Sequence, residues 1–221
     1  MATVKRSDLR SALRLMIQDS GTQNDVSDEA ANLAINQAIV AHTTEVPFAA
    51  EYEYTTATGV HEFTLPDYFV YAAYVRGYFI STNRLQFIEE IEEADWLSYW
   101  KDTQEPVGFR VNFPSQDKLY LPRAPLSEPI TFYYGVSRPE LAEDTDAVDL
   151  ASRAWSKEAI LLYAAYRAFE YLSSARARLE QWATKIDQRV DNPLEQEAKR
   201  WLAEYTRLVN KHTQAGSYGF S

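Results

Sequence analysis

The period of the apolar residues changes twice along the chain, and this constrains the fold more than any other feature. Residues 1–49 and 150–212 place apolar side chains every three to four positions, which is typical of amphipathic helices. Most of residues 50–149 instead alternate apolar and polar side chains, as half-buried strands do. Because the two periods suit different backbones, the sequence predicts an α+β protein with an antiparallel β domain inserted into a helical bundle.

The bundle is expected to hold two N-terminal helices and a long C-terminal helical hairpin. Ser7 and Ser27 are residues preferred at helix N-caps, and acidic residues follow each of them. Asn192-Pro193-Leu194-Glu195 has the form of a capping box with proline at the first helical position. It therefore predicts the start of the second arm of the hairpin.

Three segments of the β domain carry further expectations. Residues 68–80 are apolar on both faces of a predicted strand, with Tyr71 and Tyr74 on opposite faces, so this strand must be covered or meet another protein. Residues 88–100 predict a short acidic helix, and residues 140–149 a solvated acidic linker.

Charge and composition exclude several classes of protein. The 22 Lys and Arg against 32 Asp and Glu give a net charge of −10, the wrong sign for tight binding to a phosphate backbone. With no cysteine, disulfides, thiolate metal sites and cysteine nucleophiles are excluded. Without an apolar run of about 18 residues, membrane insertion is not expected. The N-terminus is polar and lacks the apolar core of a signal peptide, so secretion is not expected either.

The densest polar cluster, at residues 89–95, is the strongest candidate for a catalytic or metal site, but the indication is weak. Its carboxylates could hold a divalent cation or act as an acid and base pair, but neighbouring acids on a short helix point in different directions. A solvated acidic surface is favoured for Glu89, Glu90, Glu92, Glu93 and Asp95. The segment from Asp144 lacks the glycine and the glutamate that a calcium loop requires at positions six and twelve.

No other pattern indicates catalysis. His42, His61 and His212 have no zinc or iron spacing, and no GxGxxG, P-loop or GxSxG motif is present. The sequence therefore predicts a protein that is not an enzyme and that binds no cofactor and no metal.

The aromatic residues and the C-terminal end point to contacts with proteins. Tyr and Trp offer large amphipathic contact areas and are enriched at interfaces. Candidate subunit-interface residues are Tyr71, Tyr74, Trp182 and Trp201. For the two tryptophans, packing within the hairpin is the alternative. Residues 213–221 predict a flexible docking tail, or else a terminus without a role. The tail residues singled out are Gly216, Tyr218, Gly219 and Phe220.

Turn and packing patterns between the helices carry a family resemblance. They are Phe63-Thr64-Leu65-Pro66-Asp67-Tyr68-Phe69 after a turn at Gly59, then Pro106-Val107-Gly108-Phe109, Leu119-Tyr120-Leu121-Pro122, and Phe132-Tyr133-Tyr134 ending in Arg138-Pro139-Glu140-Leu141. In this order the chain resembles, over nearly its whole length, the head-to-tail adaptors of tailed bacteriophages. These are also called head-completion, gatekeeper or tail-tubular-type connectors.

The resemblance implies a structural virion protein in the neck, assembled in the host cytoplasm. It implies a twelvefold homo-oligomeric ring below the portal protein, with the C-terminal tail docked on the portal. The ring would continue the DNA channel without binding DNA specifically, its acidic groups near the lumen, and present a platform for a downstream tail, stopper or nozzle protein. The alternatives are another structural tail or baseplate component, or a carboxylate-dependent polymer hydrolase built on the acidic cluster.

Overall fold

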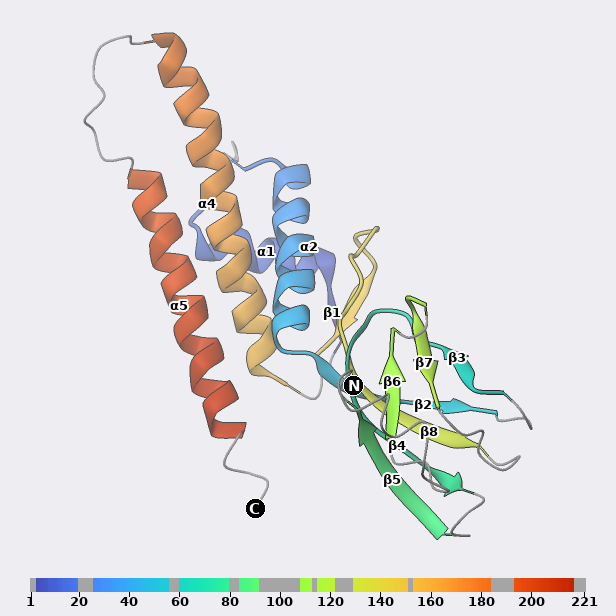
Figure 1. Ribbon diagram of the computed structural model, residues 1–221. Helices are drawn as coiled ribbons and strands as arrows, with labels where there is room; N and C mark the ends of the chain where they lie inside the picture. Colours follow the sequence, from blue (N-terminus) through green and yellow to red (C-terminus); the bar gives the residue numbers. More distant parts are fainter. Residues whose placement is uncertain are drawn as a thin grey trace. The chain divides into compact units, whose positions relative to one another are not determined.

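The chain divides into two compact units, one mainly helical and one built from a sheet (Figure 1). The computed structural model describes residues 3–19, 26–55, 60–79, 84–91, 108–112, 115–121, 129–150, 153–183 and 193–216. The helical unit comprises Met1–Val46 and Arg138–Ser221, and the sheet unit comprises Pro47–Ser137. The mixed helix and strand content is that of the predicted class.

The described part of the helical unit contains four helices and one short ribbon. The helices are α1 (Arg6–Met16), α2 (Asp28–Glu45), α4 (Trp155–Ala183) and α5 (Pro193–Gly216), and the ribbon pairs β1 (Thr3–Lys5) with β9 (Ala147–Asp149). In Figure 1, α4 runs between α2 and α5 and packs along both. Because α5 extends through Gly216, the flexible tail predicted to begin at residue 213 is wrong at its start.

Small buried side chains bring α2 and α4 close together. Where these two helices pack, both bury several alanines together with larger aliphatic residues, so that their backbones can approach. The buried residues are Ala31, Ala34, Ile35, Ala38 and Ile39 on α2, and Ala159, Ile160, Ala164, Ala165 and Ala168 on α4. Leu9 and Leu13 of α1 are also fully buried.

The predicted helix caps have different outcomes. The backbone N–H of Ala30 donates to the Ser27 hydroxyl at 3.2 Å, which confirms that cap. The Ser7 cap is wrong, because α1 begins at Arg6 and Lys5 holds the cap position without a side-chain hydrogen bond. The start of α5 at Pro193 is as predicted.

The acidic segment after the sheet is a structural part of the helical unit, so its prediction as a solvated linker is wrong. Asp144 accepts hydrogen bonds from the guanidinium groups of Arg6, at 3.0 Å, and Arg10, at 2.7 Å. These bonds hold the pKa of the Asp144 carboxyl below its usual range, and the bond from Arg10 has the larger effect. Asn36 donates to and accepts from the backbone of Leu141, at 3.1 Å each way. Since β9 also pairs with β1, the sheet unit ends at residue 137 and not at residue 149.

The sheet unit is a seven-stranded sheet in the order β2-β8-β4-β5-β6-β7-β3. The strands are β2 (Phe48–Tyr54), β3 (Glu62–Thr64), β4 (Phe69–Phe79), β5 (Arg84–Glu90), β6 (Gly108–Val111), β7 (Lys118–Tyr120) and β8 (Ile130–Val136). The prediction of an antiparallel sheet is wrong for one pair of strands, because β5 and β6 pair in parallel. The predicted acidic helix is also wrong at its start, since Ile88, Glu89 and Glu90 extend β5. Residues 92–100 of that prediction lie outside the described residues.

The sheet curls so that its two end strands meet around an aromatic core. The Tyr54 hydroxyl of β2 donates to the Thr64 carbonyl of β3 at 2.7 Å, and the Tyr54 and Phe63 rings lie 5.0 Å apart. Burial raises the pKa of the Tyr54 hydroxyl, which therefore stays protonated and keeps this bond. At the centre the fully buried Phe132 contacts the rings of Phe69 and Phe109, each at 6.0 Å.

One buried histidine makes the helical unit sensitive to acid. His42 of α2 has no exposed surface and packs edge-on against Trp155, at 5.2 Å, and Tyr205, at 6.0 Å. Tyr205 donates to Glu45 at 2.5 Å. Burial first, and then the positive charge of Arg153, lowers the pKa of His42 from 6.5 to about 4. The imidazole is therefore neutral in the folded protein at pH 7.

We predict that the helical unit loses stability as the pH falls from 6.5 to 4. In this window the unfolded chain binds a proton at His42 that the folded chain does not, so the free energy of unfolding decreases with falling pH. At pH 5 the loss is about 2 kcal/mol relative to pH 7.5. Urea unfolding at both pH values measures it, and His42→Phe should remove most of the difference. An equal loss in wild type and variant would contradict the assignment to His42.

Candidate interaction surface

The register of the sheet fixes which side chains face outward. Residues directly opposite one another on paired strands lie on the same face. Glu53 lies opposite Thr131, Thr131 opposite Arg76, and Arg76 opposite Phe87, in one row across β2, β8, β4 and β5. A second row runs from Glu51 through Tyr133 to Tyr74. Both rows alternate with the buried inner row that contains Phe132, so they define the outer face.

Two register shifts in β4 place both of its candidate tyrosines on this outer face. Side chains three positions apart on a regular strand point to opposite faces. The pairing of β4 with β8 shifts between Phe69 and Tyr71 and again between Ala72 and Tyr74. Each shift re-aims the following side chains, as bulges do. The prediction that Tyr71 and Tyr74 lie on opposite faces is therefore wrong.

Tyr71, Tyr74, Phe87 and Tyr133 form what we name the outer aromatic patch. The Tyr74 ring stacks on Tyr133 at 4.5 Å and meets Phe87 edge-on at 5.5 Å. Tyr71 covers Gly135 so closely that the Cβ of any larger residue at that position would overlap the tyrosine ring. Phe87 is 62% exposed and Tyr71 is 48% exposed. The patch is thus a preformed aromatic surface open to a partner.

Carboxylates border the patch on two sides, and we call them the acidic rim. Glu51 and Glu53 of β2 are exposed on one side, and Glu89 of β5 is exposed on the other. Within the patch, the Arg76 guanidinium lies 6.0 Å from the centre of the Phe87 ring. The rim gives the aromatic surface a negative border.

The helical unit offers a second surface, the α5 groove, with a volume of about 480 Å³. Its residues come from α1, α4 and α5. They are the apolar Met16, Leu162, Trp201 and Leu208 and the charged Glu158, Arg200, Glu204 and Arg207. The side chains of Arg200 and Arg207 are 58% and 81% exposed and pair with Glu197 and Glu204, three residues earlier on the same helix.

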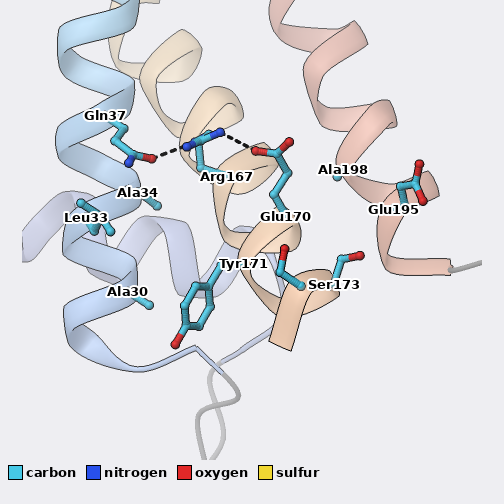
Figure 2. A pocket seen from close by; sticks show the side chains of 11 residues that line it. Ala30, Leu33, Ala34, Gln37, Arg167, Glu170, Tyr171, Ser173, Glu195 and Ala198 are labelled. Atoms are coloured by element: carbon cyan, nitrogen blue, oxygen red, sulfur yellow. Dashed lines mark hydrogen bonds and ion pairs between the residues drawn. The ribbon is translucent and has the colours of Figure 1, made fainter. Parts of the chain in front are cut away.

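A second hollow of the helical unit, of about 530 Å³, lies among α2, α4 and α5 (Figure 2). Arg167 crosses it, donating to Gln37 at 2.8 Å and to Glu170 at 2.5 Å. Leu33 and Tyr171 are exposed beside this pair. Because Gln37 and Glu170 both bind the Arg167 guanidinium, this cation has a structural role within the helical unit.

The structure places the other candidate residues as follows. Trp201 packs against the cluster that contains Ala159 and Tyr205, and the Arg200 guanidinium lies 4.8 Å from its ring. It thus takes part in helix packing while also lining the α5 groove.

Glu89 and Glu90 are exposed on β5, where a Glu90 oxygen accepts from the Val111 N–H at 3.3 Å. Trp182 lies in α4, but its side chain is not described. The remaining candidates lie outside the described residues, namely Glu92, Glu93, Asp95, Tyr218, Gly219 and Phe220.

Sequence reasoning missed Phe87, Tyr133 and the two arginines of the α5 groove. The alternation of Phe87 with Ile88, and of Tyr133 with Phe132, could have placed both rings on an outer face. The arginines gave no signal, because their surroundings depend on how α5 packs against α1 and α4.

The described residues show neither a metal cluster nor a membrane span. In that part of the chain, no three His, Asp or Glu side chains are placed to hold a metal ion. No described helix has the length and apolar character needed to span a bilayer.

An exposed aromatic patch and a charged groove define a protein with surfaces suited to binding other proteins. Comparison with family models gives the particular class, since the model for the SU10 adaptor protein matches residues 4–210. The chain belongs to this family of phage adaptors. A comparison with curated proteins found no match.

We predict that Phe87 contributes little to folding, because most of its ring faces solvent. Phe87→Ser should lower the free energy of unfolding by about 1 kcal/mol or less, the range of a cross-strand aromatic contact. Phe132→Ala, in the buried row of the same sheet, should cost about 3–5 kcal/mol. Urea denaturation of the two variants measures both effects. Equal losses would show that Phe87 belongs to the core.

Proposed function

We propose that this chain is a structural virion protein that joins the phage head to the tail. The observation that carries the proposal is the family match over residues 4–210, which includes helices and strands of both units. The outer aromatic patch supports it, because an adaptor must present surfaces that other proteins cover.

In this proposal, copies of the chain form a ring below the portal protein at the neck of the virion. The ring is twelvefold by the resemblance to head-to-tail adaptors. It receives the portal on one side and a tail, stopper or nozzle protein on the other, after assembly in the host cytoplasm. The subunit contacts include Tyr71 and Tyr74, together with Trp182 and Trp201 of the helical hairpin formed by α4 and α5.

The ring continues the DNA channel without binding DNA specifically. A net charge of −10 supports this, because acidic groups repel the phosphate backbone and let DNA slide. Acidic residues of the sheet unit, with Glu90, Glu92, Glu93 and Asp95 as candidates, would lie near the channel. Glu89 is part of the acidic rim on the outer face.

The proposal contains no catalytic centre, no cofactor and no metal. A hydrolase that uses two carboxylates needs them at a fixed separation in one cleft. Glu89 and Glu90 are consecutive residues of a strand, whose side chains point to opposite faces. Their placement therefore gives no support to the hydrolase alternative.

We predict that phage lacking this chain accumulates DNA-filled heads and separate tails. Without the adaptor, the portal offers the tail no matching surface. Electron microscopy of lysates from the deletion phage measures the tailed fraction, and supply of the wild-type chain from a plasmid should restore it. Tailed particles that lack only their distal end would instead indicate a baseplate component, and normal particles would refute a structural role.

We predict that Tyr218 and Phe220 anchor the ring to the portal. The aromatic side chains of Tyr218 and Phe220 would bury apolar area in pockets of the portal. Because every copy makes this contact, the binding free energies add up over the whole oligomer. In the plasmid assay, Tyr218→Ala with Phe220→Ala should leave the chain folded but greatly reduce its recovery on heads. Ser217→Ala with Ser221→Ala is the matched control. Equal recovery of both variants would show that the C-terminal end has no docking role.

A further inference from the structure

We infer that the outer aromatic patch of one copy docks in the α5 groove of a second copy. The inference rests on the proposed function, since it names the contact that builds the proposed ring. It concerns two surfaces on different copies, each described by the structure of its own unit.

The patch is suited to a protein partner. Phe87 is 62% exposed and meets Tyr74, which stacks on Tyr133, and Tyr71 is 48% exposed on the same face. Aromatic residues at the centre of an interface contribute more than other residue types. Because the surface is preformed by the register of β4, little side-chain entropy is lost when it is covered.

The acidic rim argues against a contact between two identical patches. Such a contact is two-fold, so each border of one patch meets a border of the other. Glu51 and Glu53 border the patch on β2, and Glu89 borders it on β5. Where the β2 and β5 borders meet, carboxylates would face carboxylates, and like charges across an interface oppose association. Arg76, the cation within the patch, lies over the Phe87 ring and inside this rim.

The α5 groove offers two exposed cations beside an apolar surface, and Glu158 and Glu204 also line it. Its apolar floor includes Met16 and Leu208, and its volume of about 480 Å³ can admit an aromatic side chain. Arg200 and Arg207, which are 58% and 81% exposed, stand at its border. Their present partners are exposed carboxylates on the same helix, and such pairs contribute only a few tenths of a kcal/mol. Arg200 also lies over the Trp201 ring, at 4.8 Å from its centre. Both arginines are more exposed than Glu197 and Glu204, which are 40% and 46% exposed, so they protrude further toward a partner. Arg207 can therefore turn to the acidic rim of a second copy at little cost, and Arg200 can meet it while it keeps its contact with Trp201.

When the patch of one copy binds the groove of another, the first copy still has a free groove and the second a free patch. Addition of copies continues until the rotation between neighbours closes a ring. A head-to-tail contact of patch and groove is thus the kind of interface that the proposed ring needs.

The test uses full-length protein and two charge-reversal variants. The patch variant carries Glu51→Arg and Glu53→Arg, and the groove variant carries Arg200→Glu and Arg207→Glu. Each variant alone places like charges across the contact, so its self-association should weaken at least about tenfold in sedimentation velocity. Mixed in equal amounts, the two variants restore opposite charges at every contact, and association should return with alternating copies. Lys199→Glu with Lys211→Glu is a matched control outside the groove, and it should associate as wild type does.

A cross-linking measurement covers the case in which association is weak. The chain has no native cysteine, so Phe87→Cys and Leu208→Cys introduce single reactive thiols. A mixture of the two variants under mild oxidation should give a disulfide between positions 87 and 208, identified by peptide mass. A mixture of Glu62→Cys with Leu208→Cys is the control and should not cross-link.

Two outcomes would overturn the inference. In the first, the patch variant and the groove variant each associate as strongly as wild type and the 87–208 cross-link is absent. This result would assign the patch to a contact with the portal or the tail. The other is a wild-type chain that stays monomeric and gives no 87–208 cross-link above the control. Either outcome would remove Tyr71 and Tyr74 from the proposed subunit contacts but would leave the proposed role of joining head to tail. That role fails only if the deletion phage still joins heads to tails.

Discussion

The pairing of β4 with β8 is the constraint on which the surfaces of this protein depend. Two register shifts along this pair turn Tyr71 and Tyr74 to the same side, while Val75 stays opposite Phe132 in the core. A regular strand would bury one tyrosine and expose the other. The shifts thus separate an aromatic core from an aromatic outer patch within one strand, and they fix the patch before any partner arrives.

The charged groups of the two units act in different ways. In the helical unit, Arg6 and Arg10 of α1 converge on Asp144, which ties the segment after the sheet to the helices. In the sheet unit, Glu51 and Glu53 stand exposed beside the aromatic patch. The first group of charges holds the fold together, and the second remains available to a partner.

Local patterns predicted much of the fold. The alternation over Ile130–Val136 places Ile130, Phe132, Tyr134 and Val136 on the buried face, and the cap at Ser27 and the proline at residue 193 mark true helix starts. These features depend on neighbours in sequence, so the sequence shows them directly.

Features that depend on distant residues were missed. Consecutive acids at the end of β5 resemble a helix start, but pairing of Ile88 with Val75 makes them strand. Asp144 looks solvated until Arg6 and Arg10, far away in sequence, are placed beside it. Of the candidate interaction surface, Tyr71 and Tyr74 were identified, but the shared face was not, because a register shift leaves no mark in the residue pattern.

A cryo-electron microscopy reconstruction of the phage neck tests the central claim most directly. The account predicts a ring of this chain between head and tail, in which Tyr71 and Phe87 of each copy are covered by the helix that carries Arg200 and Arg207 of its neighbour. A neck that lacks the chain, or a ring in which the outer aromatic patch faces solvent, would contradict it.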